Sequence, residues 1–170
     1  MKNELLKSLT RNAVVAAIYV VLTVATSGIS FGMLQVRLAE ALMLLCFFRK
    51  DYIYGLTLGC FIANLFSFMW FDILFGTLAT FLACLCICFL SFKRLAIAAL
   101  YPVIFNAFIV GAELTFYFED MPAFWINAGF VALGEFIAVC FLGYTLFMIL
   151  WRRQKALEVL GANRNLEPKW

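Results

Sequence analysis

Five ionisable side chains stand inside strongly apolar stretches or at their edges: Arg37, Glu40, Asp72, Glu113 and Glu135. A charge at the centre of a bilayer costs about 2.5–3.5 kcal/mol on an insertion scale, so such residues usually face the interior of a helical bundle and mark a ligand or ion pathway. If these residues served only to neutralise one another, a single arginine would not require four acidic partners. Surplus carboxylates suit a ligand that is rich in N–H donors or carries a positive charge.

The spacing of these residues predicts that several of them converge. Arg37 and Glu40 are three residues apart, which would place them on one face of a helix. Asn106 and Glu113 are two helical turns apart and would also share a face. The amides expected in the same region are Gln35, Asn64, Asn106 and Asn127. Together these groups predict a polar pocket open to the outside, and not a continuous pore.

A structural interpretation stays open for each of these residues taken alone. Arg37 could neutralise Glu40, and Asn106 could bridge two helices, since interhelical amides contribute modestly to packing in membranes. The excess of acids over cations favours the ligand-binding interpretation for the set as a whole.

The elements that must position these groups are apolar and numerous. The chain has 170 residues, of which 66% are hydrophobic and 14% charged, a composition that excludes a water-soluble domain. Its apolar stretches predict an all-α membrane protein, a bundle of six transmembrane helices. The predicted spans are residues 12–29, 33–48, 52–69, 71–91, 95–117 and 123–151. Residues 1–170 form a single membrane domain, and residues 152–170 are expected to be a polar cytoplasmic tail.

The basic residues predict the orientation of this bundle. Twelve of the 13 Lys and Arg residues fall into clusters at residues 2–11, 49–50, 93–94 and 152–169, which occur at every second break between apolar stretches. Because Lys and Arg are retained on the cytoplasmic side, both termini are expected there, in a multi-pass protein of a prokaryotic plasma membrane. The net charge of +3 arises from these scattered clusters, so no nucleic-acid partner is expected.

Several classes of activity are excluded or disfavoured. The chain contains no histidine, which rules out Ser/His and Cys/His catalysis and His-ligated metal sites. It also lacks a phosphate-binding loop of the G-x-x-x-x-G-K-[ST] type. Cys84, Cys86 and Cys88 would point about 200° apart in succession on a helix, which favours packing over metal binding. The sequence therefore predicts a binding or transport protein with no catalytic residue, metal or cofactor.

Four stretches of the sequence resemble the QueT family. They are FGMLQVRLAEAL at residues 31–42, GCFIAN at 59–64, DILFGTLAT at 72–80 and PVIFNAFIVGAE at 102–113. The similarity extends from about residue 12 to residue 151, and the motifs occur in the right order. Members of this family are substrate-binding S components of energy-coupling factor (ECF) transporters, associated with the uptake of queuosine precursors.

The resemblance implies a set of partners. An S component is a six-helix membrane protein that captures a micronutrient on the outer face and pairs with a membrane coupling subunit and two ATPase subunits, so ATP hydrolysis is expected on those separate subunits. The Ala-x-x-x-Ala motif of the family matches Ala13 and Ala17, which would contact the coupling subunit. A second small-residue motif, Gly55-x-x-x-Gly59, is expected to serve packing within the bundle.

The resemblance also implies a substrate, a 7-deazaguanine such as preQ0, preQ1 or queuine. Its amino-pyrimidinone edge presents N–H donors and a carbonyl acceptor, which carboxylates and amides would match. On this view Glu40, Asp72 and Glu113 are acceptors, and Arg37 orients an acid or meets a carbonyl oxygen. The residues expected to fix the orientation of the ligand are Gln35, Asn64 and Asn106, and Asn127 and Glu135 are further candidates.

Aromatic residues near the predicted pocket are candidates to stack on the ligand ring. They are Trp70, Phe71 and Phe75. Because 18% of the chain is aromatic, packing is the role that composition favours for each of them.

Other functions remain open at this point. The same scaffold could be an S component for a different vitamin. It could also be a proton-coupled secondary carrier that uses Glu135 or Glu113, or a structural membrane protein whose buried charges merely pair.

Overall fold

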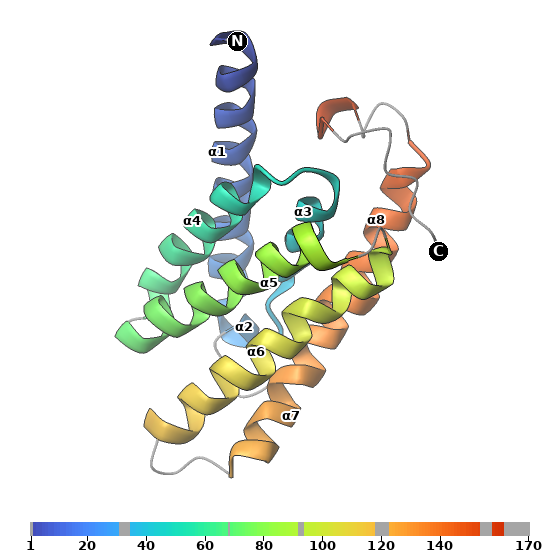
Figure 1. Cartoon of the computed structure of the whole chain (residues 1–170). Helices are drawn as coiled ribbons and strands as arrows, with labels where there is room; N and C mark the ends of the chain where they lie inside the picture. The colour runs from blue at the N-terminus through green and yellow to red at the C-terminus, as the bar shows by residue number, and fades with distance from the viewer. Residues whose placement is uncertain are drawn as a thin grey trace.

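The computed structural model of the chain describes residues 2–30, 35–67, 69–91, 94–117, 123–153 and 158–161. Within these residues the regular elements are all helical, which confirms the all-α prediction (Figure 1). Glu119, Asp120 and the tail from residue 162 lie outside the described residues.

The elements follow one another along the chain as short segments that join into longer rods. Their bounds are α1 (Lys2–Ala25), α2 (Ser27–Ser30), η1 (Leu38–Leu44), α3 (Leu45–Phe48), α4 (Tyr52–Asn64), η2 (Leu65–Ser67), η3 (Asp72–Gly76), α5 (Thr77–Leu90), α6 (Leu95–Tyr117), α7 (Phe124–Glu135), η4 (Phe136–Gly143) and α8 (Tyr144–Trp151). Elements η1 and η2 are 3₁₀-helices, whereas η3 and η4 are π-helices. The continuous rods are α1, η1–α3, α4–η2, η3–α5, α6 and α7–η4–α8.

Four of these rods are long and apolar enough to cross a membrane. They are Asn3–Ala25, Asp72–Leu90, Leu95–Phe116 and Phe124–Trp151. The two remaining predicted spans correspond to shorter apolar helices, Leu38–Phe48 and Tyr52–Ser67.

The boundaries of the first and fifth predicted spans show where apolar patterning succeeds and fails. The fifth, predicted at residues 95–117, coincides with α6. The first is expected to start at residue 12, but α1 begins at Lys2 and its N-terminal turns project beyond the other helices (Figure 1). Lys, Glu and Leu are good helix formers, so the helix continues past the end of the apolar stretch.

The second span differs most from the sequence prediction. A helix is expected from residue 33, yet residues 35–37 are not helical and η1 begins at Leu38. Gln35 has a positive φ of 41°, and Arg37 is extended with φ −89° and ψ 93°. The expectation that Arg37 and Glu40 share a helix face is therefore wrong, because Arg37 precedes the helix. Both Gln35 and Arg37 are buried, so this irregular backbone lies inside the protein.

The short rod η1–α3 occupies the centre of the bundle. Element η1 packs against α1, α4, α5, α6 and η4. The neighbouring pairs α4 and α5, α5 and α6, and α6 and α7 lie side by side around it (Figure 1). This arrangement directs the side chains of η1 into the middle of the protein, where they meet residues from every other rod.

Close backbone contact between α1 and α4 explains the second small-residue motif. A Cβ atom added to Gly55 would lie 2.7 Å from the backbone oxygen of Asn12, and one added to Gly59 would lie 3.0 Å from Cα of Ala16. The backbone N–H of Gly55 also donates to Oδ1 of Asn12 at 2.9 Å. The prediction that Gly55 and Gly59 serve packing within the bundle is confirmed.

A polar junction closes one end of the bundle. Ser8 of α1 donates to Asp51 at 2.6 Å, and the guanidinium of Arg49 donates to both carboxylate oxygens of Asp51 at 2.9 and 3.0 Å. The Tyr52 hydroxyl donates to the backbone oxygen of Leu160 at 2.8 Å. Burial raises the pKa of Asp51, but the hydrogen bonds from Arg49 and Ser8 outweigh it and hold that pKa below its usual value.

Candidate functional site

Every polar residue that the sequence singled out is buried in the structure. The set consists of Gln35, Arg37, Glu40, Asn64, Asp72, Asn106, Glu113, Asn127 and Glu135. Even the most exposed member, Asp72, has only 8% of its surface accessible. Four acids and a guanidinium within an apolar bundle are costly, and such groups persist where they are paired or serve a ligand.

Glu40 is the centre of this polar cluster. It lies in the first turn of η1 and accepts hydrogen bonds from three other elements. The Tyr19 hydroxyl of α1 and the Thr80 hydroxyl of α5, at 3.3 Å, both donate to Oε1. The Asn106 amide of α6 donates to Oε2 at 3.4 Å. The carboxylate of Glu40 is thus held in place by the protein itself.

A second network fixes the start of the fourth rod against α4. The Asn64 amide donates to the backbone oxygen of Asp72 at 2.8 Å and lies 3.4 Å from Sγ of Cys60. The Thr80 hydroxyl lies 3.2 Å from the same sulfur. Gly76 leaves room for this contact, because an added Cβ would lie 2.8 Å from Nδ2 of Asn64. The network orients Asp72 toward the cluster.

The two acids on the fourth and sixth rods stand at junctions with π-helical segments. Asp72 is the first residue of η3, and Glu135 immediately precedes η4. Pi-helical turns are rare and appear frequently at functional sites. Their occurrence beside these two acids supports a functional interpretation of the cluster.

Arg37 lies among the acids, although its backbone is extended and precedes the first turn of η1. Its guanidinium interacts electrostatically with Glu40 and Asp72, and Nε donates to the backbone oxygen of Ser30 at 3.4 Å. The carboxyl group of Glu113 on α6 lies within electrostatic reach of Asp72 and of Arg37.

Glu135 completes the cluster from the sixth rod. Its carboxyl group lies near the amide of Asn106, which donates to Glu40, so Asn106 stands beside both acids. The structure therefore brings together Arg37, Glu40, Asn64, Asp72, Asn106, Glu113 and Glu135.

Three buried oxygen atoms of the cluster have no hydrogen-bond partner among the described residues. They are Oδ1 of Asn64, Oε2 of Glu113 and Oε2 of Glu135; the amide oxygen accepts, and the carboxyl oxygens accept when they are ionised. A buried acceptor without a donor costs about 1–3 kcal/mol. The cluster is therefore short of donors, and a ligand that supplies N–H groups would satisfy it.

Other predicted residues have different surroundings. Asn127 donates to the Thr115 hydroxyl at 2.9 Å and so ties α7 to α6. Trp70 is 60% exposed, and its ring lies 4.5 Å from that of Phe71. Phe71 and Phe75 are half-buried. These positions favour packing over ligand stacking for Trp70, as the composition suggested.

The surface of α1 carries the residues that the resemblance assigned to a partner. Ala13 and Ala17 are both exposed, next to the exposed apolar side chains of Val14 and Val21. The small side chains would let another backbone approach closely.

Sequence reasoning missed three members of the cluster: Tyr19, Cys60 and Thr80. Cys60 and Thr80 stand within two of the stretches that carry the family resemblance, which was the available signal. Tyr19 is the one tyrosine in the sequence of α1, and nothing in its local pattern marks it as polar core.

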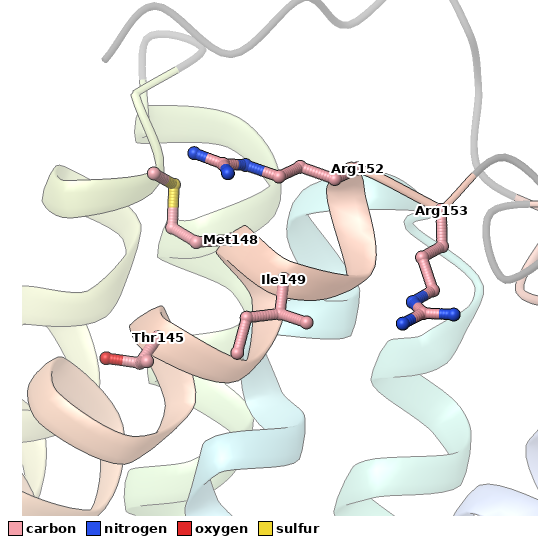
Figure 2. Close-up of a pocket in the computed structure, with 5 residues that line it drawn as sticks. All are labelled: Thr145, Met148, Ile149, Arg152 and Arg153. Carbon is pink, nitrogen blue, oxygen red and sulfur yellow. The ribbon is translucent and has the colours of Figure 1, made fainter.

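A separate cavity of about 560 Å³ lies at the end of α8 (Figure 2). It is lined by Thr145, Met148, Ile149, Arg152 and Arg153. The Arg152 side chain extends toward Met148 and that of Arg153 extends downward away from it, so the two guanidinium groups do not converge on one ligand (Figure 2). The polar cluster around Glu40 is the stronger candidate site, because its groups converge.

Comparison with known proteins identifies relatives over most of the chain. A family model described as QueT transporter matches residues 9–152. The protein "Queuosine precursor transporter QueT" of Lactococcus lactis subsp. cremoris (strain MG1363) is 38% identical over 141 residues, covering 75% of this chain and 82% of the relative. No solved structure matches the chain.

Proposed function

We propose that this chain, which belongs to the QueT transporter family, captures a queuosine precursor as the substrate-binding S component of an ECF transporter. The family match confirms the resemblance drawn from the four sequence motifs. It also agrees with the several long apolar helices, so the chain is a transporter-type membrane protein.

The shortage of donors in the polar cluster carries the proposal for the ligand. A 7-deazaguanine presents N–H groups on its amino-pyrimidinone edge and on its pyrrole ring, together with one carbonyl oxygen. The unpaired acceptors of Asn64, Glu113 and Glu135 would receive the N–H donors. Arg37 would meet the carbonyl oxygen. Glu40 is held by three protein donors and would shape the site, with room for one further donor.

The acid pair suits a ligand that also carries an amine. The carboxyl groups of Asp72 and Glu113 lie within electrostatic reach of each other. An aminomethyl cation between them would relieve their mutual repulsion and form charge-assisted hydrogen bonds, which are stronger than neutral ones. On this basis a 7-aminomethyl-7-deazaguanine is expected to bind more tightly than a neutral analogue.

The lengths of the short rods support six crossings. The seven residues of η1 and the four of α3 together span about 20 Å, and the non-helical residues 35–37 extend this rod further toward the roughly 30 Å of a bilayer core. Non-helical backbone is tolerated at membrane depth where it is buried in protein. Residues 35–37 meet that condition, because Gln35 and Arg37 are almost fully buried.

The polar junction at one end of the bundle supports the proposed orientation. The N-terminal part of α1, the loop with Arg49 and Lys50, and residues 158–161 meet there. Placing this basic end in the cytoplasm satisfies the positive-inside rule and puts both termini on that side. Residues 1–170 would then form one multi-pass domain of a prokaryotic plasma membrane, with a cytoplasmic tail from residue 152.

The proposed partners follow from the family and from the surface of α1. The exposed face around Ala13 and Ala17 would dock on a membrane coupling subunit. Two ATPase subunits would supply the energy, since the chain has no phosphate-binding loop of its own.

The proposal is tested with the purified chain in nanodiscs and in cells. We expect saturable binding of 7-aminomethyl-7-deazaguanine, and uptake only when the coupling and ATPase subunits are co-expressed. Binding of a vitamin but of no deazaguanine would indicate an S component for a different substrate. Uptake without the ATPase subunits, abolished by a protonophore, would indicate a proton-coupled carrier that uses Glu135 or Glu113.

A further inference from the structure

Tyr19 links α1 to the polar cluster. Its side chain is fully buried, and its hydroxyl donates to Oε1 of Glu40. Ala17 precedes Tyr19 by two residues, about 200° around the helix, and is exposed. One face of α1 therefore touches the candidate ligand site while the opposite face is free for a partner.

The two hydroxyl groups on Oε1 of Glu40 come from different helices. Thr80 reaches it from α5 and Tyr19 from α1, and both hydroxyls also contact the sulfur of Cys60. When a ligand donor competes for Oε1, a displaced hydroxyl can turn to Cys60. Of the two, only Tyr19 carries such a rearrangement into α1.

Contacts with α4 and with the polar junction hold α1 along its length. Ser8 and Asn12 bond to Asp51 and Gly55 in the N-terminal half of α1. About two turns further along the helix, Tyr19 packs against Gly59, since a Cβ added to Gly59 would lie 3.0 Å from Cβ of Tyr19. A displacement of Glu40 that pulls on the Tyr19 hydroxyl would therefore shift α1 against Gly59 of α4.

We propose that Tyr19 is a positioning residue that transmits occupation of the polar cluster to α1, so that the exposed face of α1 reports whether ligand is bound. This inference rests on the proposed function, because it requires ligand binding at the cluster and partner docking on α1.

Two variants form a matched pair for the test. Tyr19→Phe and Thr80→Val each remove one hydroxyl donor from the same oxygen of Glu40, but only the first disconnects α1. The probe is 7-aminomethyl-7-deazaguanine. Measurements are the Kd in nanodiscs, the ligand-dependent change in hydrogen exchange along α1, and the KM and Vmax of uptake with the partner subunits present.

We expect Kd to change by a similar factor in both variants, at most about 12-fold, because each removes one hydroxyl from the same oxygen of Glu40. Tyr19→Phe should also abolish the ligand-dependent change in exchange along α1 and lower Vmax to a clearly measurable extent. Thr80→Val should keep the change in exchange and act mainly on KM. This split between KM and Vmax separates transmission through α1 from simple positioning of Glu40.

Equal effects of the two variants on α1 exchange and Vmax would overturn the inference. If Tyr19→Phe cannot be purified, the wild-type protein is sufficient for the test. Ligand binding that leaves hydrogen exchange along α1 unchanged would also overturn the inference. Absence of ligand binding by the wild-type protein would instead refute the proposed function, and this inference with it.

Discussion

Replacement of Glu135 by glutamine should weaken ligand binding without destabilising the empty protein. Oε2 of Glu135 is buried and has no donor among the described residues. The Glu135→Gln substitution replaces this buried carboxyl group with an uncharged amide of nearly the same shape, so the unfolding midpoint of the empty protein should stay about equal.

The magnitude follows from the kind of hydrogen bond that is lost. A bond to a charged group is worth about 1.5–3 kcal/mol, and one to a neutral group about 0.5–1.5 kcal/mol. The difference of about 1.4 kcal/mol corresponds to a tenfold increase in Kd. Isothermal titration of 7-aminomethyl-7-deazaguanine into nanodiscs would measure it.

Glu40→Gln is the matched control, because Glu40 already receives donors from Tyr19, Thr80 and Asn106. A glutamine has one acceptor oxygen, so a buried donor loses its partner at a cost of about 1–3 kcal/mol. The unfolding midpoint of the empty protein should fall for Glu40→Gln only. Destabilisation of the empty protein by Glu135→Gln, with an unchanged Kd, would refute the reasoning and make Glu135 a structural residue.

Three further substitutions test the site, the polar junction and the partner surface. Gly76→Ala places a Cβ 2.8 Å from Nδ2 of Asn64, and the forced shift should cost about 1–3 kcal/mol of ligand-binding free energy, measurable by titration. Asp51→Asn loses the charge-assisted bonds from Arg49 and should lower stability at pH 7 by about 1 kcal/mol. Because the folded-state pKa of Asp51 is depressed, the wild-type advantage should disappear as the pH falls below about 4 in an unfolding titration. Ala13→Trp should leave Kd unchanged but abolish co-purification of the coupling subunit, because a large side chain blocks close helix approach.

Apolar patterning predicted the rods well where they cross the bundle as regular helices. Residues 95–117 are expected as one span and form α6, because a long and largely apolar stretch begins directly after Arg94. The same reasoning failed at residues 35–37, where burial inside the protein stabilises irregular backbone with a positive φ at Gln35. The local pattern of apolar residues cannot show that contacts with other helices will stabilise an irregular backbone.

The acids of the candidate site could be found from the sequence, and their hydroxyl partners could not. A carboxylate within an apolar stretch stands out because its cost is high, as for Glu40 and Glu135. Tyr19 and Thr80 are ordinary in membrane helices, and only the three-dimensional contact with Glu40 assigns them a role. Arg37 was recognised, but its place among the acids depends on extended backbone and not on a helix face.

The most direct test of the polar cluster as a binding site is to identify the small molecule that co-purifies with the protein in mild detergent, by mass spectrometry of an extract. We expect a 7-deazaguanine in near-equimolar amount from the wild-type protein and a much smaller amount from Glu135→Gln. A ligand of another class, or a deazaguanine retained equally by both proteins, would contradict the assignment of the polar cluster as the binding site for a queuosine precursor.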